Sequence, residues 1–525
     1  QNFEEWSLKP HTINNPGTAS GQSSAYSQSY KSQQNRMSVI VEPQLNYHFG
    51  FTNHHFDVLL GSTYQQEKSK QSSFYGTGFE SNVFIQNIAA AKNKTINDFV
   101  NTEYKYLAFF GRFNYKFSNK YFVNLTGRRD GSSRFGPNNK FANFWAIGGA
   151  WILSEEHFLK NQSWLSLAKL RGSIGVTGSD KIGDYQYLDT YTISSMSYNN
   201  TVGLLPSRLY NPDYSWEKTS KKEIALELGF FKDRIVIASS WYQNKSSNQL
   251  VGYQLPATTG FTSVIANLDA TIQNTGLEFE AYFKPFTTKR FRWESGFNIS
   301  FPVNKLLEFP DIKGSTYNNS YVVGQPISIV KVYNFLGIDP STGLYRFQDY
   351  NNDGKITAQE DKQMIENIGV KYFGGWHNSF QYKNWDLSFL FQFVKQKNWN
   401  YNSIMGIPGS MNNQPIEVLN VWSAENTNAS YMPYSTGANA VKTQLHIFYT
   451  GSTAAVSDAS FIRLKNVELA YRIPISEKII KDAKVYFQGQ NLLIITSYFG
   501  MDPEFRSIGF MPPLRTYSFG LLLTL

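Results

Sequence analysis

The chain has 525 residues, of which 16% are aromatic and only 17% charged, and its mean hydropathy is -0.38. No apolar run approaches the roughly 20 residues that a membrane-spanning helix requires, so a helical membrane protein is excluded. Cysteine is absent, which excludes disulfides, thiolate metal sites and cysteine nucleophiles. The net charge of +9 arises from scattered basic residues, so we expect no nucleic-acid partner.

The dominant sequence pattern is an alternation of apolar and polar residues in segments of about ten residues. In one segment Leu277, Phe279 and Ala281 alternate with Glu278 and Glu280. Tilted strands of a membrane β-barrel need this length and this pattern, because one side faces lipid and the other faces the lumen. A soluble β-sandwich or β-helix also alternates, but its strands are shorter and less consistently aromatic on one side. The pattern therefore favours an all-β protein, a transmembrane antiparallel β-barrel.

About fifteen such strands are expected. They begin near residues 38, 55, 104, 121, 143, 166, 216, 234, 271, 291, 376, 385, 460, 483 and 515. Short connections alternate with long ones, and the long ones cover roughly 69–103, 179–215, 244–270, 303–375, 398–459 and 493–514. Bacterial barrels have short periplasmic turns and long extracellular loops.

The odd strand number indicates which part of a barrel the chain forms. A single-chain bacterial barrel has an even number of strands, and plugged transporters have about 22. We therefore expect residues 38–525 to be the C-terminal part of such a barrel, with about seven strands outside it. Residues 1–37 are polar and predict the end of an extracellular loop. The first residues lack a basic and apolar leader, so we expect a mature form or a beginning that lies elsewhere.

Seven short motifs occur in an order and spacing that resemble the SusC/RagA group of TonB-dependent transporters. They start at Gly127-Arg128-Arg129-Asp130-Gly131-Ser132-Ser133-Arg134-Phe135-Gly136 with Gly149-Ala150-Trp151 and Ser154-Glu155-Glu156, and continue with Leu170-Arg171-Gly172-Ser173 and Gly175-Val176-Thr177-Gly178, Asn211-Pro212-Asp213 with Trp216-Glu217-Lys218, Asn274-Thr275-Gly276-Leu277-Glu278, the segment 422–428, Ser460-Phe461-Ile462-Arg463-Leu464-Lys465-Asn466, and Arg515-Thr516-Tyr517-Ser518-Phe519-Gly520. Together they cover residues 105–525.

The resemblance implies a nutrient importer in the outer membrane of a Gram-negative bacterium. It further implies a SusD-like surface lipoprotein as the partner and energy coupling by TonB through a plug domain. No plug and no TonB-contacting segment are recognisable in the sequence, so the chain departs from the family pattern there. The substrate implied is an oligosaccharide, with a peptide as the alternative.

One segment of the longest connection matches the template of a calcium-binding loop. Oxygen-bearing side chains fall at loop positions one, three and five, a glycine takes the turn at six, and the other ligands fall at seven, nine and twelve. The predicted ligands are Asp349, Asn351, Asp353, the carbonyl of Lys355, Thr357 and Glu360. Similar loops recur in the family that the chain resembles. We expect a structural Ca²⁺ in an extracellular loop over 349–360, and an Asn/Asp-Gly turn with solvated charges is the alternative.

Two further features have a structural and a functional interpretation. The run Tyr517, Phe519, Leu521, Leu523 and Leu525 predicts a lipid-facing last strand and an assembly signal for membrane insertion.

Aromatic residues in the longest loops predict loop packing, with sugar stacking as the alternative. These residues are Trp399, Tyr401, Trp422, Tyr431 and Tyr434.

No nucleophile elbow, phosphate loop or paired-carboxylate site is recognisable, so we expect no enzymatic activity. A surface adhesion or structural barrel and a barrel-borne hydrolase remain as other function classes. An adhesin would need neither plug nor energy coupling, and a hydrolase would need a catalytic constellation.

Overall fold

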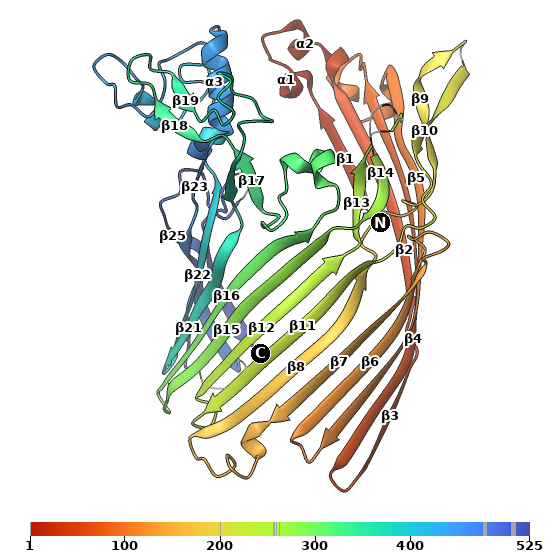
Figure 1. The fold of residues 1–525 in the computed structure, drawn as a ribbon, viewed down its shortest axis with the longest axis vertical. Helices are drawn as coiled ribbons and strands as arrows, with labels where there is room; N and C mark the ends of the chain where they lie inside the picture. Colours follow the sequence, from red (N-terminus) through yellow and green to blue (C-terminus); the bar gives the residue numbers. More distant parts are fainter. Residues whose placement is uncertain are drawn as a thin grey trace.

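The computed structural model describes residues 2–199, 201–255, 258, 260–261, 263–475, 480–505 and 511–524. An antiparallel sheet of eighteen strands dominates the fold (Figure 1). None of the described helices has the length and hydropathy that crossing a membrane requires.

The sheet is a tilted, curved wall. Its strands are β2 (Gln28–Val41), β3 (Gln44–Phe51), β4 (His54–Thr77), β5 (Asn93–Phe117), β6 (Tyr121–Ser132), β7 (Phe141–Ile152), β8 (Leu165–Ser179), β11 (Glu217–Phe230), β12 (Ile235–Ser247), β15 (Thr271–Thr287), β16 (Phe291–Glu308), β21 (Val370–Tyr382), β22 (Trp385–Trp399), β24 (Phe461–Arg472), β25 (Asp482–Thr496) and β26 (Thr516–Thr524). The short strands β1 (Asn2–Leu8) and β23 (Val456–Asp458) complete it.

Fifteen strands cross the wall, because β2 and β3 are two parts of one strand. Both pair with β4, and the ladder is interrupted only at Glu42 and Pro43. Proline has no N–H to donate, which is why it stands where pairing pauses. The expected number of strands is therefore confirmed. The observed first residues of twelve strands lie within two residues of the expected ones. The other three strands, β2, β5 and β21, begin earlier than expected, at 28, 93 and 370 rather than near 38, 104 and 376.

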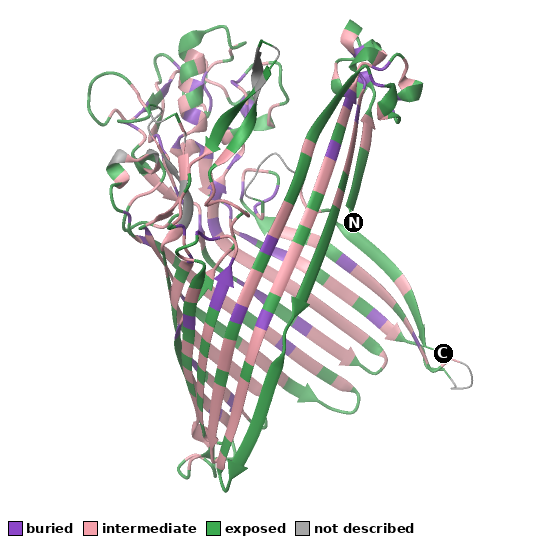
Figure 2. Ribbon diagram, turned by 90° about the vertical axis from the view of Figure 1, so that its right-hand side faces the viewer, coloured by how far each residue is buried: buried purple, intermediate pink, exposed green. Residues whose placement is uncertain are grey.

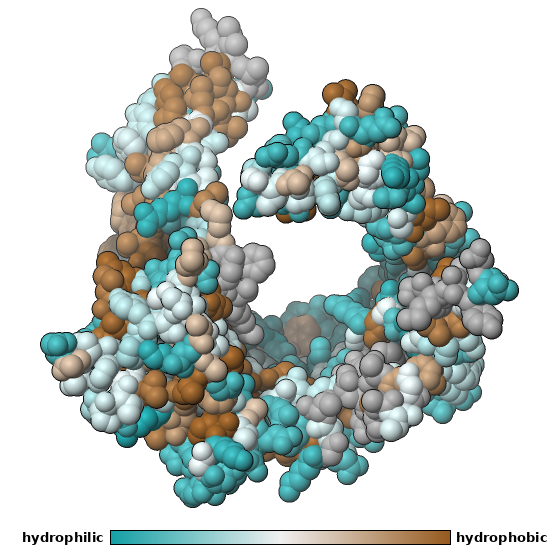
Figure 3. Space-filling model, turned by 90° about the horizontal axis from the view of Figure 1, so that it is seen from above, coloured by the Kyte–Doolittle hydropathy of each residue, from teal (hydrophilic) through white to brown (hydrophobic). Residues whose placement is uncertain are grey.

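Two edges of the wall are free in the described part of the chain. There, β26 pairs with β25 alone, and β3 pairs with β4 alone. Seen from above, the wall curves around a central hollow (Figure 3). An unpaired strand edge is not tolerated inside lipid, so each of these edges requires a further strand beside it.

Alternation divides the wall into two chemically different faces. Across β15 and β16, Leu277 stands opposite Phe301 and Phe279 opposite Ile299, while Glu278 stands opposite Ser300 on the other face. The apolar row is exposed to the outside, which in a barrel is the lipid side. The polar row therefore faces the lumen.

The last strand shows the same division. Tyr517, Phe519, Leu521 and Leu523 are exposed on the outer face, Phe519 by 81%. Leu525 lies outside the described residues. The predicted lipid-facing strand is confirmed for this stretch, and the assembly signal stays a prediction.

Aromatic rings form a band at the end of the wall where the short turns lie. Phe49 stacks on Phe56 with ring centroids 4.7 Å apart, and Trp385 lies 4.7 Å from Tyr471. Such girdles mark the membrane–water interface of outer-membrane barrels. The short turns contain residues with positive φ, among them Asn119, Asp233 and Lys383.

At the opposite end, β1, β2, β4 and β5 continue beyond the rest of the wall as a narrow blade (Figure 2). Trp6 of β1 stacks on Tyr30 of β2 at 5.3 Å, and the helices α1 (Pro10–Ile13) and α2 (Ala19–Gln22) join these two strands. The sequence predicts the end of an extracellular loop over residues 1–37. The structure instead forms strands over residues 2–8 and 28–37. Likewise, β4 and β5 occupy most of the connection expected over 69–103.

The remaining strands lie in the long connections as separate two-stranded sheets. They are β9 (Thr190–Tyr198) with β10 (Thr201–Arg208), β13 (Gln249–Gln254) with β14 (Ser263–Leu268), β17 (Ile329–Val332) with β20 (Met364–Asn367), and β18 (Phe335–Ile338) with β19 (Tyr345–Phe347). One longer helix, α3 (Ala440–Thr450), belongs to the same region.

A lysine placed on the outer face should destabilise the wall. For Leu277→Lys we expect a loss of about 2–4 kcal/mol in the free energy of unfolding, because the charge enters lipid. Ser240→Lys, whose side chain faces the lumen opposite Glu278, is the matched control and should cost far less. Denaturant titration of the intact barrel in lipid vesicles measures both, and equal losses would contradict the assignment of faces.

Candidate functional site

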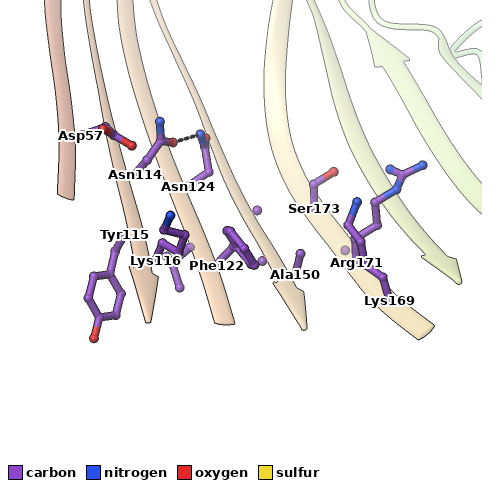
Figure 4. A pocket seen from close by; sticks show the side chains of 14 residues that line it. Asp57, Asn114, Tyr115, Lys116, Phe122, Asn124, Ala150, Lys169, Arg171 and Ser173 are labelled. Carbon is purple, nitrogen blue, oxygen red and sulfur yellow. Dashed lines mark hydrogen bonds between the residues drawn. The ribbon is translucent and has the colours of Figure 1, made fainter. Parts of the chain in front are cut away.

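Two adjoining hollows occupy the lumen face of the wall, of about 460 and 680 Å³, and both touch Arg171 and Ser173. Figure 4 shows side chains from several strands around the first hollow. Lumen-facing residues of the first are Asp57, Asn114, Lys116, Asn124, Lys169, Arg171 and Ser173. The second adds Lys221, Glu223, Tyr242, Asn244, Asn274, Glu278 and Glu280.

Charges of both signs meet at the centre of this surface. Arg171 on β8 donates from Nε to Glu227 on β11 at 2.8 Å and pairs with Glu223 on the same strand. Lys169 also reaches Glu227, with 3.2 Å between Nζ and Oε2. This network leaves carboxylate and guanidinium groups facing water in the lumen. Alternation predicts that these residues point inward, but only the pairing register shows that they meet.

The glycine- and arginine-rich motif of β6 holds a surface loop to the wall. Tyr104 and Ser132 both donate to the carboxylate of Asp180, at 2.7 and 2.9 Å. Arg134 pairs with Asp184 at 2.8 Å. The connection from β8 towards β9 is thereby held against β5 and β6.

A second family motif packs beside the first. Trp216 is buried against Phe135 and Phe144, and its indole N–H donates to the carbonyl of Lys140 at 3.1 Å. Residues that are far apart in sequence but share the family pattern are thus in contact. Their role in this chain is to fix the outer ends of β6, β7 and β11.

The two longest connections fold together into one surface subdomain, defined here as residues 329–367 and 400–455. Figure 1 shows its elements α3, β18 and β19 together above one side of the wall. Its core is apolar and aromatic and comprises Tyr333, Tyr345, Phe347, Met405, Ile407, Val418, Tyr431, Met432 and Tyr449. Tyr345 and Tyr449 stack with ring centroids 4.3 Å apart. The subdomain therefore has a core of its own.

Loop aromatics mostly serve this packing. Tyr431 is buried and donates its hydroxyl to Asn402 at 3.0 Å, while the indole of Trp422 donates to the carbonyl of Pro340 at 3.1 Å. Tyr401 makes an edge contact with Phe499. Of the five aromatics singled out in the sequence, only Tyr434 is exposed, by 51%; Tyr431 is buried and the other three are partly buried. Loop packing is thus the main role of these aromatic side chains.

The predicted calcium loop lies on the surface subdomain between β19 and β20. Both oxygens of Asp349 accept backbone N–H groups from within the loop, from Asn352 at 2.7 Å and Gly354 at 2.8 Å. The N–H of Lys355 donates to Asp353 at 2.8 Å, and Gly354 has a φ of +79°. The loop is therefore wound into a tight turn with its oxygen-bearing side chains held locally.

Two other predicted ligands contact each other. The hydroxyl of Thr357 donates to Glu360 at 3.3 Å. The ends of the loop are joined by Asp361, which is fully buried and accepts the N–H groups of Tyr350 and Thr357, each at 2.8 Å. Within the described ranges, no three His, Cys, Asp or Glu side chains converge as a metal cluster.

A buried ion pair fixes the last long connection against the lumen face. Arg463 of β24, whose side chain is 3% exposed, donates from one terminal nitrogen to both carboxylate oxygens of Asp502, at 2.7 and 2.6 Å. Lys465 pairs with Glu504 two residues on, at 3.0 Å. Amide side chains of β22 bind the same segment, because Gln396 donates to the carbonyl of Pro503 at 2.6 Å. Nothing local in the sequence shows this contact.

His446 of α3 is buried in the surface subdomain. Its Nε2 lies 2.9 Å from the carbonyl of Met405, and its Nδ1 has no hydrogen-bond partner among the described residues. Burial lowers the pKa of this histidine from its ordinary value of 6.5, although the hydrogen bond to Met405 opposes the shift. A proton on Nδ1 would place both a charge and an unsatisfied donor in an apolar core.

The surface subdomain should loosen in acid. Since burial depresses the pKa of His446, the neutral form stabilises the fold above pH 6.5, and this contribution is lost as the pH falls below that value. Limited proteolysis of the intact protein at pH 7.5 and 5.5 should show faster cleavage within residues 400–455 at the lower pH. His446→Gln, which keeps a donor towards Met405, should remove the pH dependence. An unchanged pH dependence in this variant would contradict the assignment.

Comparisons with known proteins agree with this architecture. The family model described as "TonB dependent receptor-like, beta-barrel" matches residues 1–492. TonB-dependent receptor P26 of Formosa agariphila is 30% identical over 496 residues, which cover 87% of this chain and 48% of that protein. TonB-dependent receptor SusC of Bacteroides thetaiotaomicron is 28% identical over 502 residues, covering 90% of this chain and 48% of SusC.

Among solved structures, one described as the RagAB peptide transporter matches with a TM-score of 0.82 and 24% identity, over 95% of this chain and 56% of that chain. The chain spans about half the length of the curated relatives it matches. The resemblance to the SusC/RagA group that the motifs predict is confirmed. The chain therefore belongs to the TonB-dependent receptor-like β-barrel family of the Gram-negative outer membrane.

Proposed function

We propose that this chain forms the pore wall of a TonB-dependent importer of oligosaccharides. The observation that carries the proposal is the polar, hollowed lumen face on a wall whose other face is apolar. A barrel with this division conducts polar solutes past lipid.

Oligosaccharides fit the chemistry of the lumen face. Amide and hydroxyl groups from Asn114, Asn124, Ser173, Asn244 and Asn274 line the two hollows. Amides both donate and accept hydrogen bonds, which suits the hydroxyl groups of sugars. The relative named SusC belongs to the same family.

Peptides are the second candidate, and a specific observation favours them. Arg171 and Glu223 present opposite charges on the same surface, which would suit the charged ends and side chains of a peptide. The similar solved structure is described as a peptide transporter.

We propose two protein partners. The surface subdomain exposes Met411 fully and Ile416 and Leu419 by 76% and 72%, and large exposed apolar side chains support a docking surface. A SusD-like surface lipoprotein is the proposed occupant. TonB is the second proposed partner and would act through a plug domain, which the match to the TonB-dependent receptor-like family supports.

We propose no catalytic role. The family is one of transporters, and the ionic groups of the lumen are paired across strands rather than arranged around a nucleophile. Family membership also favours an importer over an adhesin.

Uptake by cells that carry or lack the intact transporter tests the function. Carrying cells should accumulate an oligosaccharide from a mixed glycan pool, and loss of TonB should abolish this uptake. Arg171→Gln separates the substrate classes, because peptide uptake should fall about tenfold, whereas neutral glycan uptake should change less than about twofold. Lys68→Gln, outside the lumen hollows, is the control. Equal uptake by both strains would contradict an import function.

We also propose that the loop 349–360 binds a structural Ca²⁺. The ligands would be side-chain oxygens of Asp349, Asn351, Asp353, Thr357 and Glu360 with the carbonyl of Lys355. The support is the loop template, together with the tight turn at Gly354. The partly buried Ile356 packs on the subdomain core, so a bound ion would stiffen that core.

Calcium binding is tested by elemental analysis of the intact purified protein. Wild type should retain stoichiometric calcium after dialysis, and Asp353→Ala should lose it because a charged ligand is removed. Asp339→Ala is the matched control, since Asp339 is a partly exposed acid outside the loop that caps a neighbouring turn at Ser341 and Thr342. Metal-free wild-type protein whose loop resists proteolysis would contradict the proposal.

A further inference from the structure

A groove crosses the outer, lipid-facing surface of the wall between β4 and β7. Its floor is backbone, because Gly111 of β5 stands directly opposite Gly127 of β6. A Cβ atom added at Gly127 would meet nothing within 4 Å. Leu60 and Trp145 flank the glycine pair on the neighbouring strands. The result is a hollow of about 470 Å³ on a surface that is otherwise covered by apolar side chains.

The walls of the groove are apolar. On the side towards the short turns, Phe113 stands opposite Leu125, and Ile147 stands beside Leu125. On the other side, Phe109 stands opposite Arg129. Most side chains around the hollow are therefore hydrocarbon. Arg129 stands two residues beyond Gly127 on the same face of β6, at the rim of the hollow.

Arg129 is the charged residue at this rim. Its guanidinium carbon lies 5.4 Å from the centre of the Phe141 ring, and one terminal nitrogen donates to Asn143 at 3.2 Å. Its neighbour Arg128 points into the lumen and pairs with Asp130 at 2.5 Å. In the part of the chain that the structure describes, Arg129 has no carboxylate within ion-pair distance. Phe141 and Asn143 thus orient a guanidinium whose charge is left without a partner.

The height of Arg129 places it near the membrane surface. Strand β6 starts at Tyr121 beside the short turns, so Arg129 lies roughly 26 Å along the strand at about 3.3 Å per residue. With a tilt of about 40° this is a height of about 20 Å in an apolar band about 25 Å tall. Arg129 therefore lies at the upper part of the band, on the side of the long loops, where the outer leaflet has its headgroups.

We propose that this groove is a binding site for a phosphorylated lipid of the outer leaflet. The phosphate accepts hydrogen bonds from Arg129, and an acyl chain fills the groove over Gly111 and Gly127. A guanidinium matches phosphate geometry with two parallel donors. Near the membrane surface a charged side chain on the lipid face costs little, so Arg129 stands where it can meet a lipid phosphate. The function of the lumen does not require this site.

The test uses the intact protein in nanodiscs that contain lipid A or its dephosphorylated form. Native mass spectrometry and phosphorus analysis then measure how much lipid stays bound. Wild type should retain phosphorylated lipid A at least tenfold better than the dephosphorylated form. Arg129→Gln should lose this preference, and Gly127→Leu should reduce retention of both forms because the side chain fills the groove.

Two control variants separate the site from general effects. Lys105→Gln removes another exposed cation, already paired with Glu103 at 3.4 Å, and should bind as wild type does. Gly172→Leu adds a side chain to β8, which lies outside this groove because the lining residues come from β4, β5, β6 and β7. It should likewise retain the lipid. Equal retention of both lipid forms by wild type, or unchanged retention by Arg129→Gln, would overturn the proposal.

Discussion

The hydrogen-bond ladder between neighbouring strands is the constraint on which the rest of this structure depends. Lipid offers no partner for a backbone N–H or carbonyl, so every strand within the membrane must pair on both sides. Pairing fixes the register, and the register fixes which side chains face lipid and which face the lumen. Arg171 therefore meets Glu223 and Glu227 on the lumen face, and the same rule turns Arg129 outward beside its inward neighbour Arg128.

Above the membrane the chain is under a different constraint, because water satisfies unpaired backbone groups there. The long connections nevertheless fold, and they do so by burying aromatic side chains against one another. Tyr345 and Tyr449 come from different connections and meet in one core, and Arg463 fixes a third connection through Asp502. The lumen is thus bounded by a wall made from local pairing and by loops held through contacts between distant residues.

This difference explains how much the sequence could predict. The alternation in β15 and β16 is imposed by lipid on one side and water on the other, so the pattern predicts these strands, their faces and the number of wall strands. In the blade both faces of β2 and β4 meet water, so alternation of apolar and polar residues is not required there. The sequence therefore predicts loops where the structure has strands. The ligand pattern of 349–360 is local and readable in the sequence. The pairs Arg171–Glu227 and Arg463–Asp502 join residues far apart in the chain, and no local pattern predicts them.

Because this chain contains no cysteine, a single cysteine introduced into it reports the environment of its own position. The most direct measurement is the labelling of consecutive residues 277–282 on β15 by a water-soluble, membrane-impermeant maleimide. The account predicts that cysteines at Glu278, Glu280 and Tyr282 react, while those at Leu277, Phe279 and Ala281 do not. Equal reaction at all six positions, or the reverse pattern, would contradict a wall with one face in lipid and the other in a water-filled lumen.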